Sequence, residues 1–143
     1  MQVHAGGTLG GFGRVTGAIT IASGGSIAPG NFGTARLTTK RALIFESDAR
    51  YDWEFNTTNT TVDVVGAMEV TIGSGATFNP SRLGDGALQI GRFFVILENG
   101  GADPIGGTFE NLSGGSGIRV GSNKLQADYE GGDGNDLTLT VVP

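Results

Sequence analysis

The sequence predicts an all-β chain with the architecture of a solenoid, and three observations favour this fold class. Glycine supplies 27 of the 143 residues, against a usual share of ~7%. Short segments rich in β-branched and aromatic residues are separated by turn residues along the whole chain. A similar segment recurs after about fifty residues. Evenly spaced short strands also suit a sandwich or a barrel, but the recurrence and the Gly-Gly corners favour a solenoid.

The recurring segment occupies residues 15–29 and again residues 64–80. Each copy has a strand pattern, a glycine-rich corner, a shorter strand pattern and a proline, which is Pro29 in the first copy and Pro80 in the second. Glycine relieves corners that need a positive φ, and β-branched residues favour half-buried strands. A period of this length is enough for two solenoid turns of ~20–25 residues each.

Short strands are expected around these copies, while helix is the local competitor only over residues 40–50, which hold several helix formers. Strand is preferred there because Ile44 and Phe45 are strand formers. The aromatic residues at positions 51, 53 and 55 alternate with acidic ones, as on a strand with one buried face. The expected strands are 26–28, 35–38, 42–46, 51–55, 61–65, 68–72, 76–78, 87–90, 92–97, 107–110, 118–120, 124–129 and 137–142.

Composition bounds the function. The length fits one domain spanning residues 1–143. The absence of cysteine removes disulfides, thiolate catalysis and cysteine-based zinc sites. A net charge of −5 disfavours nucleic acid and anionic membranes as partners. The single histidine, His4, lies near the N-terminus and supports neither a catalytic triad nor a zinc site. We therefore expect no enzyme and no cofactor.

Two carboxylates form a candidate ligand face. Asp52 and Glu54 are two residues apart, so on a strand they share one face and could approach a sugar together, with Trp53 stacking on it if its ring points outward. A polysaccharide-cleaving enzyme requires at least two carboxylates in its catalytic site. The favoured interpretation is that both acids line a solvated face and that Trp53 packs in the core.

The glycine-rich segment 131–136 invites a metal-site reading. It resembles one calcium-binding nonapeptide of the type that works in stacked copies. Calcium requires six to eight oxygen ligands, and only one copy is present. A hairpin turn that uses Gly and Asn at positive φ accounts for the same residues and is preferred. No metal site is predicted.

Several segments, in order, resemble a known family. Gly-Gly-Thr-Leu-Gly-Gly-Phe-Gly-Arg-Val at 6–15 and Ala-Ser-Gly-Gly-Ser-Ile-Ala-Pro-Gly-Asn at 22–31 are similar to the passenger-associated transport repeat of bacterial autotransporters. Thr-Phe-Glu-Asn-Leu at 108–112 and the run from Tyr129 to Thr140 resemble the C-terminal part of such passengers. The resemblance covers most of the chain, although its motifs consist of glycine-rich turns and contain no catalytic residues.

The resemblance implies a right-handed parallel β-helix with an antiparallel hairpin at its C-terminal end, where residues from about 92 to 143 would form a capping region. It also implies a non-catalytic module of an exported bacterial surface protein, located outside the cell or on the surface of a Gram-negative bacterium. Such a module would serve as a stalk, a scaffold or an adhesion passenger.

The expected mode of action is the addition of strands at an exposed edge. The residues expected at this self-association edge are Thr8, Leu9, Val15, Ile19 and Ile21, and the expected partner is a second copy of the chain. One rival is a carbohydrate-binding or polysaccharide-cleaving module that uses the face of Asp52, Trp53 and Glu54. Another is a β-sandwich binding domain formed by residues 92–142, which antiparallel strands would reveal.

Overall fold

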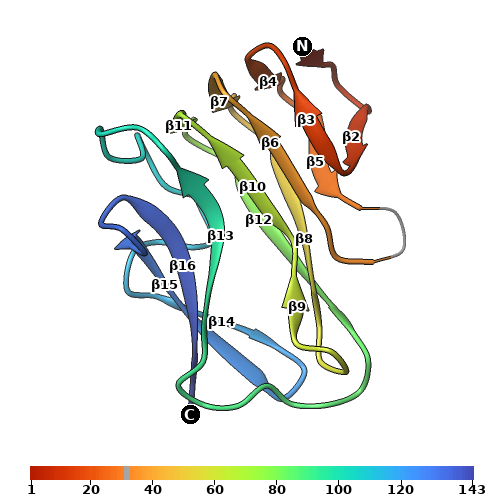
Figure 1. The fold of residues 1–143 in the computed structure, drawn as a ribbon, viewed down its shortest axis with the longest axis vertical. Coiled ribbons are helices and arrows are strands. Elements are labelled where there is room, and N and C mark those ends of the chain that lie inside the picture. Colours follow the sequence, from red (N-terminus) through yellow and green to blue (C-terminus); the bar gives the residue numbers. More distant parts are fainter. Residues whose placement is uncertain (31–32) are drawn as a thin grey trace.

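The computed structural model describes residues 1–30 and 33–143, which form sixteen strands. Figure 1 shows the chain passing from the red N-terminal strands to the blue C-terminal ones. In order, the strands are β1 (Gln2–Val3), β2 (Thr8–Gly11), β3 (Gly13–Val15), β4 (Ile19–Ile21), β5 (Ser26–Pro29), β6 (Arg36–Thr39), β7 (Ala42–Phe45), β8 (Arg50–Asn56), β9 (Thr61–Val62), β10 (Val64–Ala67), β11 (Glu69–Ile72), β12 (Thr77–Leu83), β13 (Phe93–Asn99), β14 (Gly117–Val120), β15 (Asn123–Gly131) and β16 (Asp136–Val142). No helix in the described ranges is long and apolar enough to cross a membrane.

The strands are distributed over three sheets. The first has the order β1-β4-β7-β11, the second has β2, β5, β8 and β12 in sequence, and the third has the order β14-β15-β16-β13-β10-β6-β3. The second sheet gains a fifth strand because β9 pairs with β8. We call the three sheets the four-stranded, five-stranded and seven-stranded sheets. The chain visits the three sheets in turn, so the neighbours within each sheet are distant in sequence.

The recurring segment explains this arrangement. Its first copy contains the end of β3 with all of β4 and β5, and its second contains β10, β11 and the first part of β12, so that each copy reaches all three sheets. The intervening β6, β7 and β8 lie between the two copies in all three sheets. Parallel pairing joins them, as where Leu43 of β7 lies between Ile19 of β4 and Val70 of β11. The repeat of about fifty residues thus spans two layers of strands.

Strand direction changes after β12. β13 still runs parallel to β10, but it pairs antiparallel with β16, which in turn pairs antiparallel with β15, and β15 with β14. A turn of four residues joins β15 to β16, and a two-residue turn joins β14 to β15. Such short connections reverse the chain and therefore give antiparallel neighbours. The expected C-terminal hairpin is confirmed by the pairing of β15 with β16.

The prediction of a right-handed parallel β-helix is wrong. The chain is all-β, but parallel and antiparallel pairs are combined in its sheets, and no closed solenoid forms. The physical reason lies in the connections: the turns after β8, β14 and β15 are too short for the crossover that a parallel neighbour needs. The sandwich alternative for residues 92–142 predicted antiparallel strands, and β13–β16 do contain antiparallel pairs. These strands nevertheless continue the seven-stranded sheet and do not form a separate domain.

Most local strand predictions agree with the structure. Residues 42–45 form β7, so strand is confirmed in the segment where helix competed. The alternation over residues 51–55 is confirmed as well, because Tyr51, Trp53 and Phe55 are fully buried in β8. The strands expected at 87–90 and 107–110 are wrong, since these residues lie in loops. These loops still contribute to the hydrophobic core, because the side chains of Leu88 and Phe109 are buried.

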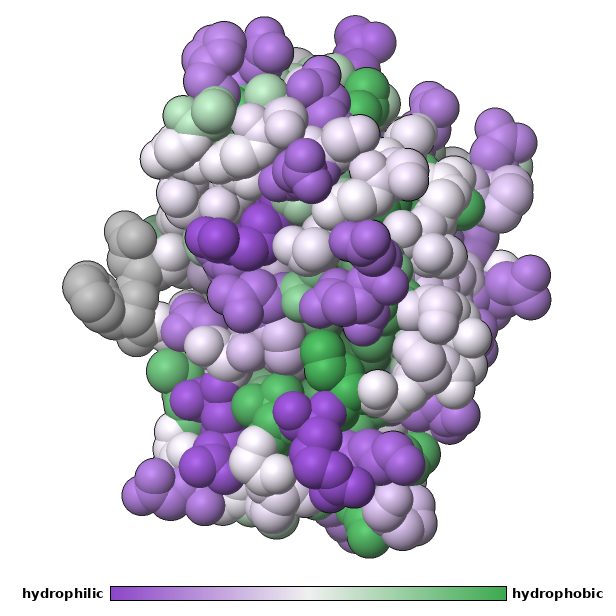
Figure 2. All heavy atoms as spheres, turned by 180° about the vertical axis from the view of Figure 1, so that it is seen from behind, coloured by the Kyte–Doolittle hydropathy of each residue, from purple (hydrophilic) through white to green (hydrophobic). Residues whose placement is uncertain are grey.

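The core is aromatic at its centre. The rings of Trp53 and Phe55 are stacked at 5.2 Å, and Tyr51 meets Phe78 edge to face at 5.7 Å. Phe109 comes from the loop before β14 and packs 5.2 Å from the ring of Phe45. Aromatic pairs of this kind add ~0.5–1.5 kcal/mol beyond area burial. From behind, the outside of the molecule is mostly hydrophilic or weakly polar in its upper half, with hydrophobic atoms gathered lower down (Figure 2).

Candidate functional site

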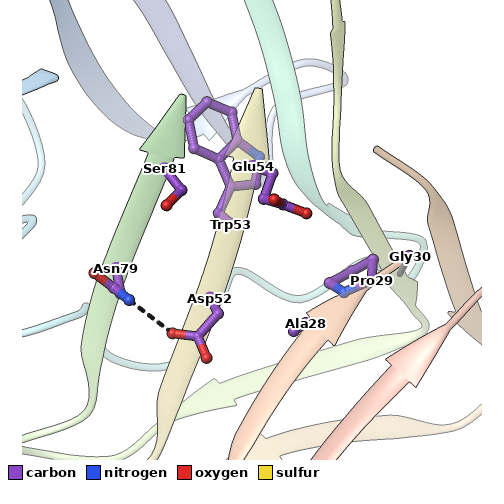
Figure 3. Close-up of a pocket in the computed structure, with 8 residues that line it drawn as sticks. All are labelled: Ala28, Pro29, Gly30, Asp52, Trp53, Glu54, Asn79 and Ser81. Atoms are coloured by element: carbon purple, nitrogen blue, oxygen red, sulfur yellow. Dashed lines mark hydrogen bonds between the residues drawn. The ribbon is translucent and has the colours of Figure 1, made fainter. Parts of the chain in front are cut away.

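A hollow of about 340 Å³ lies on the outer face of the five-stranded sheet. Its lining comes from three neighbouring parallel strands and the residue after β5 (Figure 3). The lining residues are Ala28, Pro29, Gly30, Asp52, Trp53, Glu54, Asn79 and Ser81. The sequence-predicted ligand face, Asp52 with Glu54, therefore lies within this hollow.

The hollow arises from the sizes of side chains in neighbouring strands. Asn79 pairs with Asp52 and Ser81 with Glu54, so the polar residues of β8 and β12 form two rungs. On the other side of β8, Ile27 pairs with Tyr51, and the next residue of β5 is only an alanine. Long side chains on β8 beside short ones on β5 leave a depression on the pleated surface.

Asp52 is held by two neighbours. The Nε of Arg50 donates to its Oδ1 at 2.6 Å and Nη2 to its Oδ2 at 3.1 Å, which is a bidentate geometry. The Nδ2 of Asn79 donates to the same Oδ1 at 2.9 Å, as the dashed line in Figure 3 marks. The Arg50 side chain is half exposed, so this ion pair contributes little to stability. Its effect is to fix the orientation of the Asp52 carboxylate.

Glu54 differs from Asp52 in its surroundings. Partial burial raises the pKa of Glu54 above its ordinary value. Its side chain accepts no hydrogen bond from any residue in the described ranges. The two carboxylates of this face are thus unequal: one is tied to a guanidinium, and the other has unused acceptor capacity.

Trp53 does not present its ring to this hollow. The residue is fully buried, and its indole Nε1 donates to the backbone oxygen of Asp63 at 2.9 Å. Figure 3 shows the ring on the other side of β8 from the Asp52 carboxylate. The hollow therefore has no aromatic platform, and the preferred prediction, that Trp53 packs in the core, is confirmed.

Asp63 is a buried acid that the sequence patterns do not single out. Its Oδ1 accepts from the backbone N–H of Ala35 and its Oδ2 from that of Glu54, both at 2.9 Å. Burial raises the pKa of Asp63 from 3.8 to about 7, and the two backbone donors oppose this shift. The residue links β8 to the start of β6. Asp63 falls within the expected strand 61–65, and the sequence gives no signal that this acid is buried.

The predicted self-association edge divides into two groups. Thr8 and Leu9 lie in β2 and Val15 lies in β3, and each of these strands is an edge strand of its sheet. Ile19 and Ile21 lie in β4, between β1 and β7, and are fully buried. They are thus not at an edge, because the two-residue strand β1, which the sequence patterns did not predict, covers them.

The first edge has unused backbone groups. The carbonyl of Gly7 accepts from Ser26, and the N–H and carbonyl of Gly11 both bond to Gly30. Because backbone groups alternate along a strand, those of Thr8 and Gly10 are directed away from β5. Within residues 1–30 and 33–143, no strand pairs with this side of β2.

The opposite end of the parallel strands is covered. Backbone bonds join β11 to Gly106, with Ile72 donating at 2.6 Å. At β12, the amide of Asn111 acts as a substitute strand: its Oδ1 accepts from the N–H of Phe78 at 2.8 Å, and its Nδ2 donates to the carbonyl of Phe78 at 2.7 Å. The seven-stranded sheet continues into β13 and β16. The two ends of the parallel part are therefore unlike.

The segment 131–136 forms the turn between β15 and β16. The Nδ2 of Asn135 donates to the carbonyl of Gly101 at 2.6 Å, and Asp136 accepts from the N–H of Asn99 at 2.8 Å. Gly132 and Gly134 have positive φ, as the turn interpretation predicts, but the expectation of a positive φ at Asn135 is wrong. In the part of the chain that the structure describes, no three His, Cys, Asp or Glu residues lie close enough to hold a metal ion.

Comparisons with known proteins add no family. No family model matches the chain, and no curated protein matches it. The candidate surfaces are thus described by their own geometry: the hollow on the five-stranded sheet, and the edge formed by β1, β2 and β3.

Proposed function

We propose that the chain is a non-catalytic structural module of an exported bacterial surface protein and acts as a stalk, a scaffold or an adhesion passenger. The observation that carries the structural role is the unlike pair of ends, with β1–β3 open and β11–β13 covered. The location at the cell surface rests on the similarity of residues 6–15, 22–31 and 129–140 to autotransporter passengers.

The mechanism is mechanical rather than chemical. Each layer of parallel strands bonds to the next through its main chain, and buried aliphatic and aromatic side chains fill the space between the sheets. Such ladders resist bending because each inner strand is bonded to a neighbour on both sides. A module of this kind separates or presents other parts of a protein.

The open edge gives the module a way to associate. Unpaired strands are templates for further strands, and β2 carries no proline, lysine or glutamate that would block pairing. Phe12, between β2 and β3, is 83% exposed and offers an apolar contact. The partner is a second copy, joined edge to edge about a two-fold axis, because the covered end offers no matching set of strands.

Charge gives this association a distinctive salt dependence. Residues 1–45 contain four basic side chains, Arg14, Arg36, Lys40 and Arg41, and no acidic one. Arg36 is ion-paired with Glu98, and two copies that meet at this end bring the remaining positive charges together. Salt screens such repulsion, with a Debye length of ~10 Å at 0.1 M. The association therefore strengthens as salt increases.

Sedimentation velocity at rising protein concentration, in low and high salt, tests this proposal. We expect a monomer–dimer equilibrium that shifts toward the dimer at high salt. Thr8→Pro removes an outward N–H from the edge strand and should leave a monomer, whereas Ile90→Ser, at a residue 63% exposed elsewhere, should associate like the wild type. A wild type that stays monomeric throughout, or filaments that dissolve in salt, would contradict the proposal.

A further inference from the structure

We propose that the hollow on the five-stranded sheet binds an uncharged glycan, through hydroxyl groups that bond to Glu54, Ser81 and Asn79. This site lies on an outer sheet face, one strand in from the open edge at β2, and goes beyond the proposed scaffold function.

The acceptor is Glu54. Its carboxylate accepts no hydrogen bond within the described residues and borders the hollow. An ionised carboxylate has about four lone-pair positions and accepts two donors side by side. Two neighbouring hydroxyls of a sugar present such a pair of donors. Partial burial of Glu54 raises its pKa, because part of the water that would solvate the carboxylate is excluded.

The remaining polar groups lie at matching positions on β12. Ser81 is in register with Glu54 and Asn79 with Asp52, so the hollow has two polar rungs across β8 and β12. Asn79 is exposed, and its Nδ2 already donates to Asp52, which leaves its Oδ1 as an acceptor for a ligand hydroxyl. A hydroxyl at Ser81 both donates and accepts. Sugar hydroxyls, which also do both, suit this mixture.

Charge selects an uncharged ligand. The guanidinium of Arg50 offsets the charge of Asp52, so Glu54 supplies the excess negative charge of the hollow. No lysine, arginine or histidine belongs to its lining among the described residues. Carboxylated or sulfated glycans would thus meet repulsion without a compensating cation.

The floor is apolar but small. Ala28, which is partly exposed, offers a methyl group on which one face of a sugar ring can rest, while Pro29 is buried. The only tryptophan, Trp53, has its ring in the core and supplies no stacking surface. Affinity is therefore weak, about millimolar, and a polymer with many equivalent units would gain from repeated engagement.

Amide chemical shifts of the ¹⁵N-labelled protein, titrated with dextran and with soluble galactomannan, test this proposal. We expect one of these neutral polymers to shift amides at 28–30, 52–54 and 79–81. Glu54→Gln should weaken the interaction about tenfold, because it replaces a charged acceptor by a neutral one. The matched control Glu69→Gln alters an exposed acid on β11 and should bind like the wild type.

Four outcomes would overturn the proposal: no shifts with either neutral polymer, shifts confined to other faces, stronger binding of polygalacturonate, or calcium chloride alone shifting the same amides. Equal melting temperatures of the variants exclude unfolding as a cause. The monomeric Thr8→Pro variant should bind the glycan like the wild type. Glycan binding and self-association can therefore fail separately.

Discussion

The mainly parallel strands β1–β12 and the mainly antiparallel strands β13–β16 show the same side-chain alternation but differ in their neighbours. In β8, the buried Tyr51, Trp53 and Phe55 alternate with residues outside the core, and in β15 the buried Leu125 and Ala127 do the same. β8 pairs with strands from other layers, whereas β15 pairs with strands joined to it by short turns. Alternation thus specifies which face is buried, and the connections specify strand direction.

This difference also decides how each region ends. The parallel region ends at β1–β3 in open edges, because no strand within the described residues pairs beyond them. The antiparallel region supplies its own neighbours and, with the loop before β14, covers the far end of the parallel layers. One end is available for association and the other is protected.

The largest expected effect comes from the side chain that couples the two regions. Phe109 lies in the loop before β14, yet its ring packs against Phe45, Tyr51 and Phe78 of the parallel part. Phe109→Ala should lower the free energy of unfolding by about 3–5 kcal/mol, measured by urea denaturation. Phe93→Ala, at a residue 61% exposed on β13, is the control and should have little effect. Equal effects would mean that the regions are not coupled through this ring.

Each region also holds a buried acid, and pH should act on both. Burial raises the pKa of Asp63 from 3.8 to about 7 and raises that of Asp136 as well. A pKa that is higher in the folded state favours the protonated form, so stability is greatest below about pH 4 and falls as pH rises toward 7. For Asp63 the loss is at most about 4 kcal/mol, at ~1.4 kcal/mol per pKa unit.

Urea midpoints at pH 4, 5.5 and 7.5 measure this dependence. Asp63→Asn should flatten most of the decline, because its side chain stays neutral at every pH. Asp136→Asn should flatten it less, since only the shift of Asp63 reaches about 7. A midpoint that increases with pH in the wild type would show that the backbone donors to Asp63, and not its burial, control its ionisation.

A smaller effect is expected where the antiparallel side covers β12. Asn111→Ala removes both hydrogen bonds to the backbone of Phe78 and should cost about 1–3 kcal/mol, again from urea denaturation. Asn111→Asp keeps the acceptor for the N–H of Phe78 and loses the donor, so an intermediate loss is expected. If both variants matched the wild type, the substitute-strand role of Asn111 would be refuted.

Much of the local structure could be predicted from the sequence. The alternation at residues 51–55 identified a strand and its buried face, because it reflects side-chain burial along a single strand. The acidic pair at 52 and 54 was placed correctly on an outer face for the same reason. The recurrence at 15–29 and 64–80 identified strands that lie in the same three sheets. Strand direction was predicted incorrectly for the pairs of β13 with β16 and of β14 with β15, since side-chain patterns are equal in parallel and antiparallel sheets. The antiparallel hairpin of β15 and β16 was expected.

The remaining features depend on contacts between distant segments. β1 has only two residues, too few for a periodic pattern, yet it decides that Ile19 and Ile21 are not at an edge. The covering role of Asn111 depends on β12, more than thirty residues away. The hollow depends on small residues of β5 beside the carboxylates of β8, which only the pairing of these strands brings together.

Amide hydrogen exchange at a concentration where the protein is monomeric tests the difference between the ends most directly. The N–H groups of Thr8 and Gly10 on β2 should exchange rapidly, while that of Phe78, bonded to Asn111, should be protected to nearly the extent of the core strands. Slow exchange at Thr8 and Gly10 together with rapid exchange at Phe78 would contradict the assignment of an open first edge and a covered last one.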